Sequence, residues 1–205
     1  SKSSYEYGGA ISSSANLYVH NCHFLNNSAY SGGAISSSGS ITYDPSYYGY
    51  YYDYMYYCES YWTNDYSNYT NYYRTKYGKY PEEVLYPDYT LEFINCTFEK
   101  NKATSNYGGA MYINKGPGYG MGYENYLLIK NCTFEKNAAR TGGAIYGGYN
   151  GYYYYEEQEQ GILNCTFIDN SATSDGGAIH SSEFSTQNCT FINNTATKGG
   201  AIYGV

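Results

Sequence analysis

The chain has 205 residues, a formal net charge of −7, and only 11 Lys and Arg residues, which are scattered along it. Nucleic acids and anionic membrane surfaces are bound by clustered positive charge, so this balance argues against both as partners. No run of about 18 apolar residues occurs, which argues against membrane insertion. The 34 Tyr, the 24 Gly and the charged fraction of 14% favour an extracellular β-protein over a cytosolic helical enzyme.

One motif recurs along the chain and predicts a repeat architecture. Half a copy, YGGAI, stands at residues 7–11. Each full copy joins Asn-Cys-x-Phe to a later Gly-Gly-Ala-Ile, with Met in place of Ile in the second. The full copies are residues 21–35, 95–111, 131–145, 164–179 and 188–202.

Within each copy, Cys and Phe stand two residues apart and therefore share one face of a predicted strand. They form a predicted core ladder: Cys22, Cys96, Cys132, Cys165, Cys189, Phe24, Phe98, Phe134, Phe167 and Phe191. Upstream apolar residues such as Leu17 and Val19 have the opposite parity, so the chain must bend between the two sets. The residue at this junction is always Asn, which tolerates the left-handed conformation of a tight bend. We expect this Asn ladder to face inward: Asn21, Asn95, Asn131, Asn164 and Asn188.

A second Asn ladder and an Ala column follow, both expected to face inward. The ladder comprises Asn27, Asn101, Asn137, Asn170 and Asn194. The Gly-Gly pair then lets the backbone pass close to a neighbouring wall. Each copy thus predicts three short strands and three corners, and the 24-residue spacing of Cys165 and Cys189 suits one turn of a three-sided parallel β-helix. We predict one all-β domain over residues 1–205, with about five to six coils. A helical solenoid is disfavoured by the Gly pairs and the period-2 runs.

Three insertions lengthen the repeat, at about residues 37–90, 113–126 and 147–160. All leave from one corner, after the Gly-Gly-Ala-Ile strand, so stacking predicts that they project along one edge of the β-solenoid. They hold most of the Tyr, and this Tyr edge includes Tyr51, Tyr52, Tyr152, Tyr153, Tyr154 and Tyr155.

The pairing of Phe-x-x-Asn with Gly-Gly-Ala-Ile resembles the repeat of polymorphic outer-membrane proteins. It is also similar to adhesin-like surface proteins of archaea and protists. The resemblance covers the coils, somewhat over half of the chain. It implies a secreted, right-handed, single-stranded parallel β-helix that serves in adhesion or surface structure.

The Cys column has two interpretations. Neighbouring copies place Cys about 4.8 Å apart, which is within the range that a disulfide accepts. Parallel side chains would strain such a bridge, so a stack of buried thiols is favoured, with disulfides as the alternative. Cys58 lies in the first insertion without a partner in the column. The only nearby histidines are His20 and His23, and we expect neither a metal nor a cofactor.

Seven Asn-x-Ser/Thr sequons occur. Four coincide with the junction Asn, where a structural bend is the favoured interpretation. The remaining three are the candidate glycosylation sites: Asn26, Asn68 and Asn193.

Polysaccharide-degrading enzymes use this fold, so the carboxylates need attention. Catalysis there requires convergent Asp or Glu with basic residues or Ca²⁺ beside them. Glu99 and Glu135 stand beside Lys100 and Lys136 instead, which is typical of a solvated turn. We therefore predict no catalytic residues and disfavour an enzyme.

These features favour an extracellular structural or adhesive protein that assembles with itself. The open ends of a β-helix expose unpaired strands, and no polar cap is visible in the sequence. We expect Ile202 of one copy to stack on Ile11 of the next, which builds a head-to-tail filament. Tyr-rich surfaces also bind ligands well, so the alternative is a glycan- or host-binding adhesin module excised from a longer surface protein.

Overall fold

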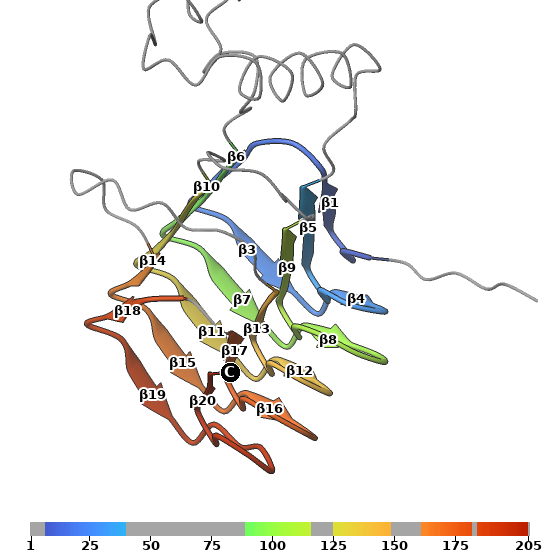
Figure 1. Cartoon of the computed structure of the whole chain (residues 1–205), viewed down its shortest axis with the longest axis vertical. Coiled ribbons are helices and arrows are strands. Elements are labelled where there is room, and N and C mark those ends of the chain that lie inside the picture. Colours follow the sequence, from blue (N-terminus) through green and yellow to red (C-terminus); the bar gives the residue numbers. More distant parts are fainter. Residues whose placement is uncertain (1–6, 40–88, 116–124, 149–160, 182–183, 205) are drawn as a thin grey trace, which may run out of the picture.

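The computed structural model describes residues 7–39, 89–115, 125–148, 161–181 and 184–204. These residues form 20 strands and no helix. The strands pair only in parallel, in four sheets that stack one coil upon the next (Figure 1). The prediction of a parallel β-helix is therefore confirmed.

We name each sheet after a residue type that it buries. The isoleucine sheet contains β1 (Ile11–Ser13), β5 (Ile35–Gly39), β9 (Met111–Lys115), β13 (Ile145–Gly148), β17 (Ile179–Ser181) and β20 (Ile202–Tyr203). The leucine sheet contains β2 (Leu17–His20), β6 (Tyr89–Ile94), β10 (Asn125–Lys130), β14 (Gly161–Leu163) and β18 (Thr186–Gln187). The phenylalanine sheet contains β3 (His23–Leu25), β7 (Thr97–Glu99), β11 (Thr133–Glu135), β15 (Thr166–Ile168) and β19 (Thr190–Ile192). The alanine sheet contains β4 (Ser28–Ala29), β8 (Lys102–Ala103), β12 (Ala138–Ala139) and β16 (Ser171–Ala172).

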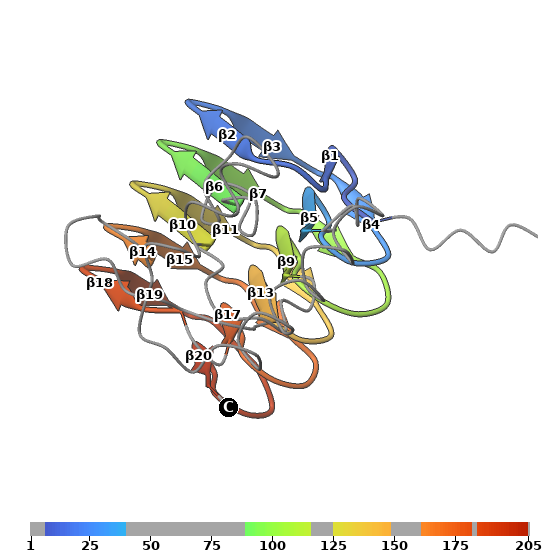
Figure 2. The same cartoon turned by 45° about the horizontal axis from the view of Figure 1, so that its top comes forward.

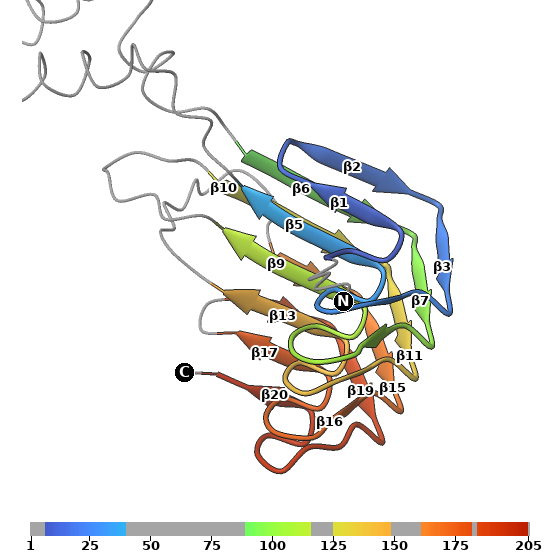
Figure 3. The same cartoon turned by 90° about the vertical axis from the view of Figure 1, so that its right-hand side faces the viewer.

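Every coil visits the sheets in the same order, so equivalent residues form columns along the solenoid. Figure 2 shows the strands descending in ladders from the first coil (blue) to the last (red). Seen from the side, the isoleucine sheet runs from β1 to β20 with the phenylalanine sheet beside it (Figure 3).

The coil has four strands where the sequence predicted three. The junction Asn residues have φ of 52–54°, which confirms the expected left-handed bend. A second left-handed residue, with φ of 52–56°, lies four positions after each Cys and turns the chain again before the Ala column: Asn26, Lys100, Lys136, Asp169 and Asn193. This extra corner separates the Ala residues into a short strand of their own.

The interior is a continuous apolar core built from the columns. Phe98, Phe134 and Phe167 are fully buried, and their rings stack at centroid separations of 4.8 Å. Ile35, Met111, Ile145 and Ile179 form a parallel column on the isoleucine sheet. Since each side chain rests on its equivalent in the next coil, the repeat itself provides the packing.

The three insertions join the isoleucine sheet to the leucine sheet, between β5 and β6, β9 and β10, and β13 and β14. Most of their residues lie outside the described part of the chain, and these include the predicted Tyr edge (Tyr51, Tyr52 and Tyr152 to Tyr155), Cys58 and Asn68.

Candidate functional site

The second Asn ladder is a continuous chain of hydrogen bonds between coils. Asn101 donates two hydrogen bonds to Oδ1 of Asn137, from its backbone N–H at 2.9 Å and from Nδ2 at 3.0 Å. Asn137 makes the same pair of bonds to Asn170. All three residues are fully buried.

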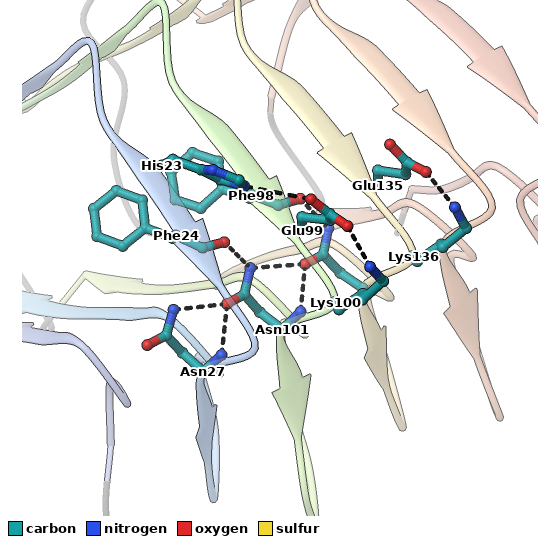
Figure 4. Close-up of polar contacts among 10 residues, drawn as sticks. His23, Phe24, Asn27, Phe98, Glu99, Lys100, Asn101, Glu135 and Lys136 are labelled. Carbon is teal, nitrogen blue, oxygen red and sulfur yellow. Dashed lines mark hydrogen bonds and ion pairs between the residues drawn. The ribbon is translucent and has the colours of Figure 1, made fainter.

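Each Asn also reaches back to the preceding coil. Nδ2 of Asn101 donates to the carbonyl oxygen of Phe24 at 3.0 Å, as Figure 4 shows together with the Asn27–Asn101 bonds. Nδ2 of Asn137 donates in the same way to Phe98. An Asn thus bonds to the coil on either side of it, which satisfies polar atoms that burial would otherwise leave unpaired.

This ladder has a direction, so its two ends differ. At the first coil, Oδ1 of Asn27 accepts no bond from any described residue. At the last coil, Asn194 accepts from Asn170 and donates to Phe167, yet its backbone N–H has no acceptor among the described residues. One end therefore presents a free acceptor, Oδ1 of Asn27, and the other presents a free donor, the backbone N–H of Asn194. Elsewhere in the ladder, a backbone N–H of this kind donates to an Oδ1 of this kind.

The Gly-Gly corner sets the distance between coils. A Cβ on Gly109 would lie 2.1 Å from the carbonyl oxygen of Gly143 and 2.6 Å from the nitrogen of Ala138. In each pair before the last one, a Cβ on the second Gly would likewise meet the backbone of the following coil. Gly200 is the exception, because its Cβ would meet only the oxygen of Asn194, at 3.4 Å. The surface that faces Gly200 is thus open in the last coil.

The two residues predicted to join copies occupy opposite ends of one column. Ile11 pairs with Ile35 at the first coil, and Ile202 pairs with Ile179 at the last. Ile179 is 1% exposed, whereas Ile202 is 42% exposed. The difference arises because no described residue covers Ile202.

The predicted Cys ladder contains no disulfide among its members. Cys22, Cys96, Cys132, Cys165 and Cys189 are all free thiols. The backbone N–H of Cys132 donates to Sγ of Cys165 at 3.4 Å. Hydrogen bonds with the sulfur atoms of Cys165 and Cys96, and then burial, raise the pKa of Cys132 above its ordinary value. Because Cys132 is 1% exposed, its thiol is inaccessible to reagents in the folded chain.

The parity argument expected the junction Asn residues to face inward, but they do not. Asn21, Asn95, Asn131, Asn164 and Asn188 are exposed. Because the left-handed turn occurs at the Asn itself, the residue lies on the outside of the corner while its neighbours on both sides face the core. Nδ2 of Asn95 donates to Oδ1 of Asn21 at 3.2 Å, so an outer ladder still forms. Asn26 and Asn193, two candidate glycan acceptors, lie on the next corner and are exposed.

Sequence reasoning missed an aromatic stripe on the outer face of the isoleucine sheet. Tyr107 stacks on Tyr146 with ring centroids 4.2 Å apart. Burial, followed by the neighbouring Tyr residues, raises the pKa of Tyr112 to about 12. Tyr107 precedes the Gly pair whereas Tyr112 and Tyr146 follow the Ile column, so no single repeat position predicts the stripe. Its members are Tyr7, Tyr107, Tyr112, Tyr146, His180 and Tyr203.

The charged residues form local pairs on the surface. Glu99 contacts both Lys100 and His23, and Glu135 contacts Lys136 (Figure 4). Among the described residues, no group of three or more His, Cys, Asp or Glu side chains is arranged to hold a metal ion. The described residues also include no helix long and apolar enough to cross a membrane.

Comparison with protein-family models matches the Chlamydia polymorphic membrane protein repeat at residues 21–38, 131–148, 164–182 and 188–205. Each match begins at or beside a junction Asn and extends through the following Gly-Gly-Ala-Ile. The resemblance seen in the sequence is thereby confirmed for four copies. Comparison with curated proteins gave no match, and neither did comparison with solved structures.

Proposed function

We propose that this protein, whose repeats match the polymorphic membrane protein repeat, is a non-catalytic structural or adhesive component of the cell surface. We also propose that its copies join head to tail into a filament. The repeat family supports the surface location. The open ends of the inner Asn ladder carry the proposal of assembly.

The two end coils complement each other atom by atom. Asn194 offers a backbone N–H and an Nδ2 hydrogen in the orientation that Asn170 uses toward Asn194 itself. Asn27 offers the Oδ1 that would accept both. Its Nδ2 can in turn donate to the carbonyl oxygen of Phe191, as the Nδ2 of Asn194 does to Phe167.

Only one relative orientation satisfies these groups. Two first coils would place acceptor against acceptor, and two last coils would place donor against donor. A head-to-tail contact does not close on itself, so it propagates into a fibre rather than stopping at a dimer. The repeat family supports the adhesive role, and a fibre would repeat one adhesive surface along its length.

Gly200 supplies a selective test of assembly. Gly200→Ala is expected to fold normally, because its Cβ has room in the single chain. In a filament the same Cβ would press against the backbone of the next copy, as the Cβ of Gly177 would against Gly200 at 1.9 Å. Gly204→Ala is a matched control, since its Cβ meets only Ser181 of its own chain, at 3.5 Å.

Sedimentation velocity and negative-stain electron microscopy of the three proteins give the readout. We expect filaments from the wild type and from Gly204→Ala, and monomers from Gly200→Ala with an unchanged circular dichroism spectrum. A wild-type chain that stays monomeric at every concentration, or a Gly200→Ala chain that forms filaments as readily as the wild type, would contradict the proposal.

A further inference from the structure

The bend at the junction Asn distributes one tripeptide over the two sides of the solenoid wall. In Asn131-Cys132-Thr133, Asn131 is exposed, Cys132 is buried and Thr133 is partly exposed. Both polar side chains of the tripeptide therefore lie outside, and only Cys enters the core. Residues 95–97 and 164–166 repeat this arrangement, and at residues 188–190 an exposed Asn and an exposed Thr flank a partly buried Cys.

This exposure changes the meaning of the Asn-Cys-Thr sequence. Asn-x-Thr is the acceptor sequence for N-linked oligosaccharides, and an Asn that faced the core could not hold one. The bend and an acceptor role use different parts of the same residue. The backbone of Asn131 forms the turn, with φ of 54°, whereas its side-chain amide lies on the surface.

We propose that the junction Asn residues with a Thr two positions later are N-glycosylation sites, which form a row along the corner between the leucine and phenylalanine sheets. The acceptors are Asn95, Asn131, Asn164 and Asn188. The donor class is a lipid diphosphate-linked oligosaccharide, used by an oligosaccharyltransferase. This inference goes beyond the proposed function and is independent of head-to-tail assembly.

The transfer is a substitution at the anomeric carbon of the first sugar. Nδ2 of the Asn forms a bond to this carbon, and the bond from the carbon to the diphosphate oxygen breaks. The lipid diphosphate leaves with the electron pair of that bond, and Nδ2 loses one proton to a base of the transferase. The step requires no oxidant or reductant.

The outer Asn ladder is compatible with this modification. Nδ2 of Asn131 donates to Oδ1 of Asn95 at 3.3 Å, and Nδ2 of Asn95 donates to Oδ1 of Asn21 at 3.2 Å. A side-chain amide carries two hydrogens on Nδ2. Transfer replaces one of them by the sugar, so the other remains to donate to the neighbouring coil.

The spacing of the coils restricts which acceptors carry a glycan together. Leu163 pairs with Gln187, and Thr166 pairs with Thr190. Asn164 and Asn188 lie between these pairs and are therefore one strand spacing apart, about 4.8 Å. A branched oligosaccharide is much wider than this spacing. A glycan on one of these two residues therefore excludes a glycan from the other, and the same limit applies to every pair of neighbouring coils.

The chain contains its own negative control. Asn21 has the same exposure and the same φ of 54° as the proposed acceptors. It is followed by Cys22 and His23, so no hydroxyl stands at the third position. Asn21 should therefore stay unmodified under conditions that modify the other junction Asn residues.

Glycosylation of the full chain, secreted from a eukaryotic host, tests the proposal. Release of the glycans by peptide N-glycosidase in water labelled with heavy oxygen converts each glycosylated Asn to a labelled Asp. Trypsin leaves Asn164 and Asn188 on one peptide, residues 141–198, because no Lys or Arg lies between Arg140 and Lys198. We expect mass spectrometry to find the label at Asn164 or at Asn188 of this peptide, but not at both, and no label at Asn21.

Thr166→Ala and Thr190→Ala each remove one acceptor sequence of this pair and leave both Asn bends in place. Loss of the glycan from the more occupied Asn should raise the occupancy of the other. Thr166→Ser keeps the acceptor sequence and should reproduce the wild-type pattern. Secreted protein without a label on any of the four junction acceptors would overturn the proposal. Peptides labelled at both Asn164 and Asn188, or an unchanged occupancy after loss of the major glycan, would overturn the exclusion between coils.

Discussion

Replacing Asn137 by Ala tests whether the inner Asn ladder holds the coils together. The substitution removes four hydrogen bonds: two that Asn101 donates to Oδ1, one from Nδ2 to Phe98 and one from Nδ2 to Asn170. At about 1 kcal/mol net for each bond, the free energy of unfolding should fall by about 4 kcal/mol. The loss is large because Asn101 and Asn137 are fully buried, so water cannot replace the missing partner.

Asn131→Gly in the same coil is the matched control. Asn131 is exposed and donates from Nδ2 only to Oδ1 of Asn95, at 3.3 Å. Gly accepts the φ of 54° at this position without strain. The expected change in the free energy of unfolding is below about 1 kcal/mol.

Urea unfolding followed by far-ultraviolet circular dichroism compares the two variants with the wild type. Asn137→Ala should unfold at a clearly lower urea concentration than Asn131→Gly. If both variants lost the same small amount of stability, the inner ladder would not be the element that joins the coils.

The remaining predictions concern the core, the thiols and the charged surface. Phe134→Ala, which empties a fully buried position between two stacked rings, should lower the free energy of unfolding by about 3–5 kcal/mol, and a loss below about 1 kcal/mol in urea unfolding would contradict the packing. A thiol reagent should modify exposed Cys22 rapidly and buried Cys132 only on unfolding. Mass spectrometry of partially labelled protein identifies which Cys reacts first, and labelling of Cys132 before Cys22 would contradict the burial of Cys132. The pKa of Glu99 is held below its ordinary value by the hydrogen bond from Lys100 and by nearby positive charge. The ionised carboxylate therefore stabilises the folded chain at a pH above the ordinary pKa, and this stabilisation is lost as the pH falls through the folded-state pKa. Thermal unfolding should therefore separate the wild type from Glu99→Gln at neutral pH, with the difference shrinking as the pH falls below the ordinary pKa of Glu, and a difference that grew in acid would reverse the assignment.

Periodicity was sufficient to predict the β-helix and the bend at each junction Asn, because both depend on which residue types recur. The fourth side of the coil escaped prediction for the opposite reason. Its corner has no constant residue type. Asn26, Asp169 and Asn193 tolerate the left-handed conformation, but Lys100 and Lys136 have no preference for it and adopt it because stacked coils impose it.

The expected inward orientation of the junction Asn failed for a related reason. Alternation assigns a face only while the strand continues, and at Asn131 the backbone turns. The aromatic stripe lay beyond sequence reasoning because Tyr107 and Tyr146 occupy different positions in the repeat and meet only when coils stack.

Cryo-electron microscopy of the wild-type chain tests the central claim most directly, because the axial repeat of a filament counts the strands that each copy contributes. Head-to-tail assembly in which five coils per copy continue the leucine and phenylalanine sheets predicts a repeat of about 24 Å, from strands about 4.8 Å apart. Isolated rods of one copy, or antiparallel pairs joined at like ends, would contradict the account.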